Sequence, residues 1–422
     1  MWLLSQLLRR GVQDGRLTVR DAAGGVHEFG PGPQTPDSPP DVAIRLTDKG
    51  AAFKIARDPA LGAAEAYMDG RLELEDGSEI YDLLKLVTWN FRWARGNELH
   101  KITQQPKWKT WLDGRNHDRR AKRNVAHHYD LSDRLYDLFL DADRQYSCAY
   151  WRPGNQGDLA RAQQDKMAHI AAKLLLEPGQ RVLDIGSGWG GLALYLHKVS
   201  GVDVLGVTLS EEQLAVANQR AEAAGVADHV KFELIDYRKV TGAFDRVVSV
   251  GMFEHVGLPH YQDFFDQVAD RLTPEGVALV HSIGRAAGPG ATDSFMAKYI
   301  FPGGYAPALS QVLPRIEQAG LWTTDIEILR GHYALTTEAW YRTCVEKKDE
   351  IIALYDERFW RMWTFYLAGA AMAFRHMGQM VFQAQLSPSM SAVPATRDYI
   401  GETEQRYAIL AEGPAASRVA GG

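Results

Sequence analysis

A glycine-rich stretch near the middle of the chain has the composition of a cofactor-binding loop. Residues 182–191 read Val-Leu-Asp-Ile-Gly-Ser-Gly-Trp-Gly-Gly, after an apolar run that predicts a strand and before a run with helical periodicity. Gly186 and Gly188 let the backbone turn tightly and let a ligand approach where a β-carbon would interfere. A nucleoside-bearing cofactor fits such a loop, and a purely structural turn is the alternative.

The glycine spacing argues against a dinucleotide such as NAD or FAD. Gly-x-Gly-x-Gly, from residue 186 to 190, is shorter than the Gly-x-Gly-x-x-Gly of dinucleotide-binding loops. Asp184 precedes the first glycine, where class I methyltransferases place an acid near the methionine end of S-adenosylmethionine. We therefore expect S-adenosylmethionine as the cofactor.

The following strands offer polar groups for the rest of the cofactor. A carboxylate about 20 residues beyond the loop usually binds the ribose hydroxyls, but this segment reads Val-Thr-Leu-Ser-Glu-Glu-Gln from residue 207 to 213. We expect Thr208 and Gln213 to replace the carboxylate with neutral hydrogen bonds, with Glu211 as the alternative. Asp236 could accept a hydrogen bond from the adenine amino group, or it could only form a turn.

The elements around these residues predict an α/β domain. From Lys173 onward strands and helices alternate, which is typical of a doubly wound, mostly parallel sheet. Strands are expected at residues 180–185, 202–208, 230–236, 244–250, 277–282 and 324–329, and an aromatic-rich helical pattern covers residues 341–385. Glu254 then follows the fourth strand and His281 ends the fifth. Such sheets bind ligands at the carboxyl ends of their strands.

The N-terminal part has a different pattern. Short half-buried strands are expected at 16–20 and 42–46, and helical periodicity covers 60–86, so residues 1–115 predict a smaller α+β domain that ends in a linker at 104–120. The catalytic domain is expected over residues 116–412. Residues 413–422 read as a frayed tail.

Composition and charge limit the classes of partner that the protein is expected to bind. A net charge of −6 argues against a nucleic-acid-binding protein. One basic run, residues 119–123 followed by His127 and His128, suits anionic lipid head groups or a solvated connector. Two cysteines indicate a reducing, cytoplasmic compartment and exclude a metal site built on cysteines. The N-terminus lacks the features of a signal peptide and predicts an amphipathic helix.

Contact with a membrane, if it occurs, is expected to be peripheral. The longest apolar stretch runs from Trp363 to Phe374, and a span needs about 20 residues.

Several motifs together resemble the cyclopropane-fatty-acyl-phospholipid synthase family, which is related to the mycolic acid cyclopropane synthases. They occur in the family order, and residues 66–70 resemble its extra N-terminal domain. The strings are His-Tyr-Asp-Leu-Ser (128–132), Tyr-Ser-Cys-Ala-Tyr (146–150), Leu-Asp-Ile-Gly-Ser-Gly-Trp-Gly (183–190), Val-Thr-Leu-Ser (207–210), Met-Phe-Glu-His-Val (252–256), His-Ser-Ile-Gly (281–284) and His-Tyr (332–333).

The resemblance implies a Rossmann-like class I methyltransferase fold with a seven-stranded sheet, and a specific set of site residues. A bicarbonate ion, acting as catalytic base, would be held by Cys148, Glu254, His281, the backbone of Ile283, and Tyr333. S-adenosylmethionine would be contacted by Tyr146, Ser147, Gly186, Gly188, Thr208, Leu209, Gln213 and Asp236.

The implied reaction adds a methylene bridge to a cis double bond of a phospholipid acyl chain. After methyl transfer, a proton must leave the new methyl group for the ring to close, and a compact anion in an apolar site suits that step. The alternatives are a methyl-branched or methylene product, transfer to nitrogen, and a noncatalytic lipid-binding protein. The substrate would be unsaturated phospholipid at the inner face of the membrane, where a homodimer would gain avidity.

Overall fold

The computed structural model describes residues 1–92 and 131–412, and the chain forms two compact units. Unit 1 comprises residues 1–110, 290–302 and 334–379, and unit 2 comprises residues 111–289, 303–333 and 380–422. The expected linker, the basic run with its two histidines, most of the His-Tyr-Asp-Leu-Ser motif and the tail 413–422 lie outside the described residues. The predicted boundary between the N-terminal and catalytic domains, at residues 115 and 116, also lies outside the described residues and stays a prediction.

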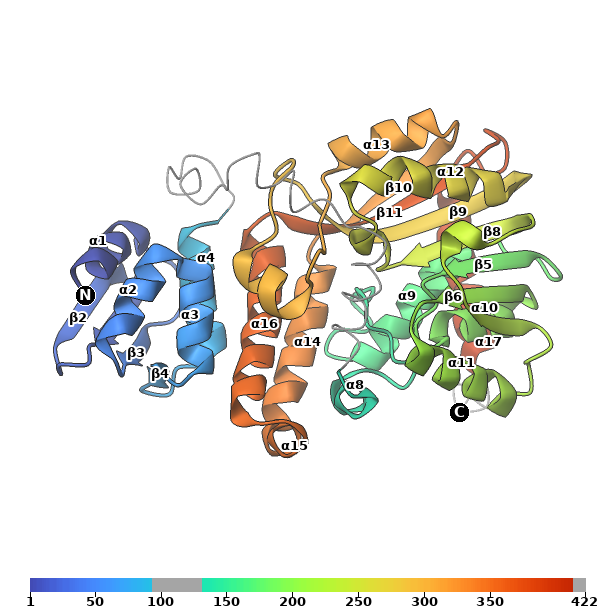
Figure 1. The fold of residues 1–422 in the computed structure, drawn as a ribbon. Helices are drawn as coiled ribbons and strands as arrows, with labels where there is room; N and C mark the ends of the chain where they lie inside the picture. Colours follow the sequence, from blue (N-terminus) through green and yellow to red (C-terminus); the bar gives the residue numbers. More distant parts are fainter. Residues whose placement is uncertain (93–130, 413–422) are drawn as a thin grey trace, which may run out of the picture. The chain divides into compact units, whose positions relative to one another are not determined.

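Unit 2 is built on a seven-stranded sheet with the order β10-β11-β9-β8-β5-β6-β7 (Figure 1). Strands β5 to β9 pair in parallel, whereas β10 and β11 pair antiparallel. The sheet confirms the predicted mostly parallel α/β architecture. Its strands are β5 (Arg181–Ile185), β6 (Asp203–Thr208), β7 (Val230–Leu234), β8 (Phe244–Val250), β9 (Leu272–Arg285), β10 (Trp322–Leu329) and β11 (Gln379–Ser387).

Helices cover both faces of this sheet, because successive strand residues are apolar on both sides. Leu183 and Val247 belong to one core, with α12 and α13, while Val182 and Val248 belong to the other, with α9, α10, α11 and α17. The helices of unit 2 are α8 (Asp133–Phe139), α9 (Leu159–Lys173), α10 (Gly191–Ser200), α11 (Glu211–Ala223), α12 (Tyr261–Arg271), α13 (Leu309–Gln318) and α17 (Asp398–Glu412).

The strand order creates a ligand-binding position at β5 and β8. From β5 the chain moves outward to β6 and β7 on one side, and it then returns to place β8 and β9 on the other. The connections that leave the carboxyl ends of β5 and β8 therefore diverge, and ligands of open α/β sheets bind at such a point. The glycine loop follows β5, and the segment with Glu254 follows β8.

The expectation that residues 341–385 are helical is wrong at its C-terminal end. Helices α14 (His332–Glu346), α15 (Lys348–Leu354) and α16 (Glu357–His376) occupy most of the segment, but β11 begins at Gln379. Gly378, at a φ of +73°, separates α16 from the strand. Strand β11 is buried on both faces and carries two buried glutamines, Gln383 and Gln385, so it lacks the alternation that marks a half-buried strand.

Two further boundaries differ from expectation. Strand β7 stops at Leu234, so Asp236 lies beyond the strand and not at its end. Strand β9 continues to Arg285, so His281 lies inside it. Both differences are of the kind expected for element ends read from sequence alone.

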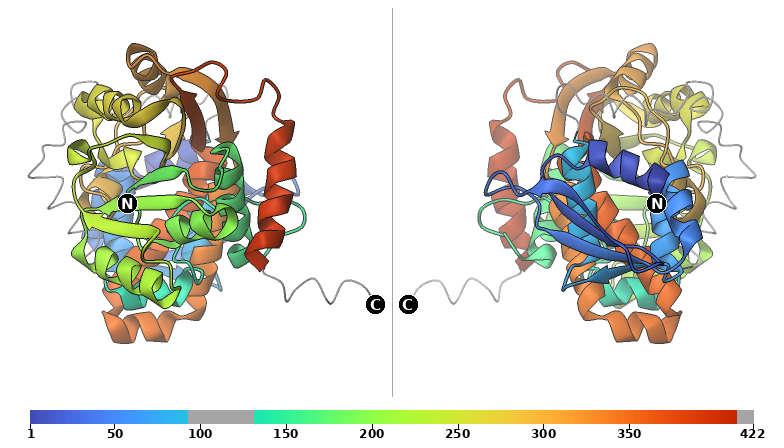
Figure 2. Two further views of the ribbon diagram at one scale, coloured as in Figure 1. Left: turned by 90° about the vertical axis from the view of Figure 1, so that its right-hand side faces the viewer. Right: turned by 90° about the vertical axis from the view of Figure 1, so that its left-hand side faces the viewer.

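Unit 1 contains a second sheet, with the order β2-β1-β3-β4, whose blue strands face the viewer in the right-hand view of Figure 2. Helix α16 packs against α3 and α4. The N-terminal elements are α1 (Trp2–Gly11), β1 (Gly15–Arg20), β2 (Val26–Gly32), β3 (Val42–Leu46), α2 (Lys49–Arg57), α3 (Pro59–Met68), β4 (Leu72–Glu75) and α4 (Ile80–Asn90). The expected α+β character, the two strands and the N-terminal helix are present, but the helical expectation for residues 60–86 is wrong at β4, which separates α3 from α4. Among the described helices, none combines the length and the apolar character that crossing a bilayer requires.

Candidate active site

The loop after β5 has an open side at Gly188. Gly186, Gly188 and Gly190 all have positive φ, at +85°, +54° and +81°. A β-carbon at Gly186 would lie 2.9 Å from the Met252 side chain, whereas one at Gly188 would meet no described atom within 4 Å. The backbone at Gly188 is therefore accessible to a ligand, as expected for a cofactor loop.

Asp184 points a carboxylate into the protein under this loop. It is 2% exposed, and its Oδ2 has no hydrogen-bond partner among the described residues. Burial raises the pKa of Asp184 to about 7, although the charge of Lys166 opposes the shift. The hydroxyl of Ser187 is likewise buried without a partner in the described chain. Buried polar groups are nearly always satisfied, so both atoms are candidates to bind the cofactor.

The segment with Tyr146, Ser147 and Cys148 is held by helix α9. The ammonium of Lys166 donates to Ser147 Oγ at 2.9 Å, and the Gln163 amide donates to the Ser147 carbonyl at 3.0 Å. Burial lowers the pKa of Lys166 to about 8. Tyr146 packs edge-on against Tyr136. Sequence reasoning did not identify Gln163 or Lys166, because polar residues at helical spacing normally form a solvated face.

The end of β6 brings together two of the residues predicted to form a neutral ribose site. Thr208 Oγ1 donates to Gln213 Oε1 at 3.1 Å, and both side chains are buried. Ser210 caps α11 by accepting from the Gln213 amide, which fixes the start of the helix. Leu209, in contrast, is 37% exposed. These residues lie together at the carboxyl end of β6, and their contact with ribose stays a prediction.

Asp236 forms a turn and an ion pair. Its Oδ1 accepts from the Arg238 backbone amide at 3.0 Å and from the Arg238 Nε at 2.9 Å, and Oδ2 contacts Nη2 at 2.5 Å. Burial would raise the pKa of Asp236, but the hydrogen bonds from Arg238 outweigh it and lower the pKa. The observed contacts of Asp236 are therefore those of a turn-forming residue, which is one of the two expectations from the sequence. A hydrogen bond from the adenine amino group to Asp236 stays a prediction.

Glu254 lies in a short 3-10 helix (Phe253–His255) after β8 and contacts β9 directly. The Ile283 amide donates to Glu254 Oε1 at 2.5 Å, while Oε2 is buried with no hydrogen-bond donor among the described residues. Burial raises the pKa of Glu254 to about 7, against the lowering effects of the backbone amides of Ile283 and Glu254 and of the nearby Ser282 hydroxyl, which itself donates to the Ile283 carbonyl at 3.0 Å. The carboxylate therefore has one fixed oxygen and one available oxygen.

His281 lies two residues before Ile283 and is 2% exposed. Its Nδ1 lies 3.1 Å from the Gln383 Nε2, and its carbonyl accepts from the Gly251 amide at 2.9 Å. Burial and the neighbouring cations Lys166 and Lys173 hold the pKa of His281 well below its ordinary value. The imidazole is therefore neutral.

Cys148 and Tyr333 lie on two other segments of unit 2. Cys148 is fully buried in the loop that Lys166 holds. Tyr333, also buried, follows β10 at the start of α14, and its neighbour His332 accepts a hydrogen bond from the Trp151 amide at 2.9 Å. That bond ties the Tyr333 segment to the Cys148 segment. The structure thus joins Glu254 to Ile283 directly and joins the Tyr333 segment to the Cys148 segment; that these two groups form one site stays a prediction.

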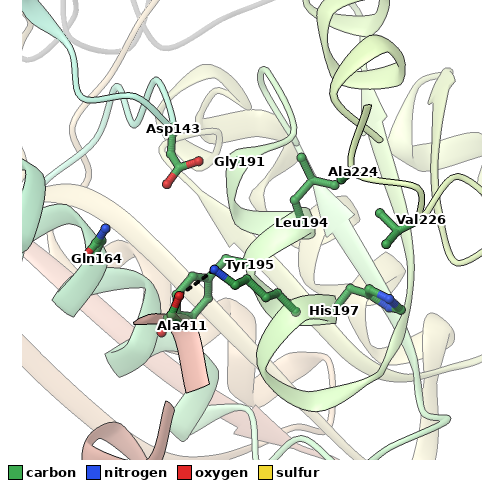
Figure 3. Close-up of a pocket in the computed structure, with 10 residues that line it drawn as sticks. Asp143, Gln164, Gly191, Leu194, Tyr195, His197, Ala224, Val226 and Ala411 are labelled. Atoms are coloured by element: carbon green, nitrogen blue, oxygen red, sulfur yellow. Dashed lines mark hydrogen bonds between the residues drawn. The ribbon is translucent and has the colours of Figure 1, made fainter. Parts of the chain in front are cut away.

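A pocket of about 510 Å³ lies elsewhere, along α10 (Figure 3). It contains none of the predicted site residues, and the Lys198 ammonium bonds to the Ala411 carbonyl at its edge. Its lining comprises Asp143, Gln164, Gly191, Leu194, Tyr195, His197, Lys198, Ala224, Val226 and Ala411. The side chains that could perform chemistry are therefore not gathered in this pocket.

The sequence and the structure match proteins of known type. The family model described as mycolic acid cyclopropane synthetase matches residues 116–384. A cyclopropane-fatty-acyl-phospholipid synthase of Escherichia coli is 37% identical over 360 residues, which cover 83% of this chain and 88% of that protein. A probable fatty acid methyltransferase of Pseudomonas putida is 36% identical, with coverage of 83% and 86%.

A solved structure shows the same fold. The cyclopropane synthase MmaA2 of Mycobacterium tuberculosis has a TM-score of 0.59 and 33% identity, over 63% of this chain and 97% of that one. The mycolic acid cyclopropane synthase CmaA1, solved with SAH and CTAB, matches with the same TM-score at 32% identity.

Proposed function

The chain belongs to the mycolic acid cyclopropane synthetase family of S-adenosylmethionine-dependent methyltransferases, and from this premise we propose that it is a cyclopropane-fatty-acyl-phospholipid synthase. The proposed substrate is a phospholipid with a cis double bond in an acyl chain. The relative from Escherichia coli bears that name and aligns over 88% of its own length, which supports the phospholipid substrate over a mycolic acid.

The observation that carries the proposal is the second oxygen of Glu254. A buried carboxylate whose Oε1 is fixed by the Ile283 amide, and whose Oε2 has no donor in the described chain, suits a small ligand with a hydroxyl group. Bicarbonate has such a hydroxyl, together with oxygens that can accept from His281 and Tyr333. Bound there, bicarbonate would supply the base that removes a proton beside the cofactor.

The residues have distinct tasks in the reaction that we propose. An alkene is a weak nucleophile, so the loop of Gly186 and Gly188 and the Thr208–Gln213 pair must hold the cofactor close to it and in line. One alkene carbon would bond to the methyl carbon as the sulfur–methyl bond breaks and S-adenosylhomocysteine leaves, and the other alkene carbon would become a carbocation. Burial of the site would keep water away from that cation. Glu254, His281 and Tyr333 would hold the base where it can take a proton from the new methyl, and the electron pair of that C–H bond would then form the ring bond.

A related lipid methyltransferase is the second candidate. The relative from Pseudomonas putida is a probable fatty acid methyltransferase of nearly equal similarity. A methylene product would arise from the same carbocation if a hydride shifted from the methyl-bearing carbon to the cationic carbon before the new methyl lost its proton. A methyl branch would additionally need a separate hydride donor to reduce that methylene. A base held by Glu254 would lie near the glycine loop, since the side chain of Met252, two residues earlier, lies against Gly186, and this proximity supports ring closure.

Unit 1 offers a surface for peripheral contact with a membrane. Helices α1 and α2 pack together, and Trp2, Leu3 and Phe53 are exposed on them, at 76%, 44% and 61%. The exposed cations of the same two helices are Arg9, Arg10, Lys49, Lys54 and Arg57. Exposed aromatic residues beside cations suit the interface of an anionic bilayer. We infer peripheral binding at the cytoplasmic face; a homodimer there stays a prediction.

The experiment uses vesicles of phospholipid with cis-unsaturated acyl chains and methyl-labelled S-adenosylmethionine. The proposal expects label in the acyl chains, and upfield cyclopropane protons in the NMR spectrum of the extracted lipid. Vesicles with saturated chains are the matched control and should take up no label. Vinylic methylene signals would support the second candidate, and label in the head group would contradict both.

A further inference from the structure

A polar connection leads from the buried ammonium of Lys173 to the ring of His281. Lys173, at the end of α9, donates from Nζ to Gln383 Oε1 at 2.9 Å. The other end of that amide, Nε2, lies 3.1 Å from His281 Nδ1. Lys173, Gln383 and His281 are each at most 2% exposed, so solvent cannot substitute for these bonds.

The chemistry of Lys173 fixes the orientation of the Gln383 amide. An ammonium group has only donors, so the atom of Gln383 that it contacts must be the carbonyl oxygen. Burial lowers the pKa of Lys173, but its ion pair with Glu327 opposes the shift and keeps the group charged. Glu327 is itself held by His169 at 2.7 Å. The amide nitrogen of Gln383 is therefore directed at His281.

The orientation of Gln383 in turn decides which nitrogen of His281 bears the proton. An amide NH₂ can only donate, so Nδ1 must accept, and the proton of the neutral ring resides on Nε2. From this geometry we infer that Gln383, oriented by Lys173, is a positioning residue that holds His281 as the Nε2–H tautomer. In that form His281 can donate from Nε2 to an anion, which the opposite tautomer cannot.

This inference rests on the proposed function for the identity of the anion, but not for the tautomer itself. Gln383→Met removes both bonds at nearly constant volume and leaves Nδ1 without its donor. Gln385→Met is the matched control, because Gln385 is equally buried on β11 and bonds to the Lys173 carbonyl and the Tyr399 hydroxyl, not to His281. General damage to β11 would affect both variants alike.

The test is nitrogen NMR of the full chain labelled with ¹⁵N-histidine, with His281 assigned by the signals that His281→Asn removes. We expect wild type and Gln385→Met to show a protonated Nε2 and a bare Nδ1, and Gln383→Met to show both tautomers. Turnover of Gln383→Met should fall by the same factor as the Nε2–H fraction of His281, about twofold for an equal mixture of the two tautomers, with unchanged affinity for S-adenosylmethionine. Gln385→Met should keep its turnover.

A protonated Nδ1 in wild type, or an unchanged tautomer with full turnover in Gln383→Met, would overturn the inference. If Gln383→Met does not fold, the wild-type spectrum still decides. The two proposals fail separately. A wild-type Nε2–H tautomer in a protein that forms no cyclopropane would sink the proposed function alone, and a ring-forming enzyme with Nδ1–H would sink only the role of Gln383.

Discussion

The backbone amide of Ile283, on β9, donates to Oε1 of Glu254, which follows β8, at 2.5 Å. This bond joins the ends of two neighbouring parallel strands and leaves Oε2 of the carboxylate available. A carboxylate anchored through one oxygen can bind a small ligand with the other at little cost in side-chain entropy.

Substitution of Glu254 should separate chemistry from cofactor binding. Glu254→Gln keeps the size of the side chain but removes the anionic acceptor, and we expect turnover to fall by about 10²- to 10³-fold, as for a group that acts in the transition state. Calorimetry should give an affinity for S-adenosylmethionine close to that of wild type. Glu233→Gln, at an exposed position on β7, is the control. Full turnover in Glu254→Gln would refute the assigned role.

The buried carboxyl of Glu254 should also make stability depend on pH. Its pKa is raised from 4.5 to about 7 in the folded protein, so the neutral form is favoured there. The resulting contribution to the free energy of unfolding is complete when the pH is below the pKa of Glu254 in the unfolded chain. It is lost as the pH rises through the pKa of Glu254 in the folded protein. Relative to Glu254→Gln, the free energy of unfolding of wild type should therefore fall by on the order of 3 kcal/mol between about pH 4.5 and 7.

The measurement is chemical denaturation of both proteins across this pH range, without cofactor or bicarbonate. Both proteins contain the same other titrating groups, so the difference between their free energies of unfolding reports Glu254 alone. If that difference stays constant with pH, Glu254 is not desolvated in the apo protein.

Gly188 should be needed for the cofactor and not for the fold. Gly188→Ala would place a methyl group in the open space at the loop, and we expect at least about a tenfold loss of affinity for S-adenosylmethionine, equivalent to about 1.4 kcal/mol. Gly225→Ala is the control, because Gly225 also has positive φ and open space around it, but lies between α11 and β7. Both variants should lose about 1–2 kcal/mol of stability. Equal affinity in the two would place the cofactor elsewhere.

The exposed aromatic residues of α1 and α2 should contribute to membrane binding. The double variant Trp2→Ser, Phe53→Ser removes two side chains whose burial is worth roughly 1.5–3 kcal/mol each, so sedimentation with anionic vesicles should fall at least about tenfold. Trp322→Ser, at another exposed tryptophan on β10, should bind as wild type does. An equal loss in both proteins would indicate nonspecific adhesion.

The sequence predicts the central sheet well because the strands β5, β6 and β8 are apolar runs separated by clear turn residues. It fails at β11, where Gln383 and Gln385 interrupt an apolar segment directly after a long helix. Those glutamines are buried because they bond to groups of α9 and β9, which are distant in the chain. Local periodicity in the sequence cannot reveal partners that are distant in the chain.

The residues of the candidate site likewise divide into those that the local sequence identifies and those that only the folded structure identifies. Asp184 and Glu254 could be selected because a glycine loop and a strand end locate them, whereas His281 is selected at an expected strand end that β9 in fact passes. Gln163, Lys166, His169 and Lys173 could not, since their spacing along α9 matches that of a solvated helix face, yet each is at most 2% exposed. Only the packing of α9 in the structure reveals that this face is a buried polar support for the site.

The central claim, ring formation, is tested most directly by the fate of the transferred carbon. The protein is incubated with cis-unsaturated phospholipid vesicles, bicarbonate and S-adenosylmethionine carrying a ¹³C-methyl group, and the extracted lipid is analysed by carbon-edited proton NMR. We predict that the label appears in a ring methylene with two inequivalent upfield protons. Label found only in a vinylic methylene or in a branched methyl group would contradict the assignment as a cyclopropane synthase.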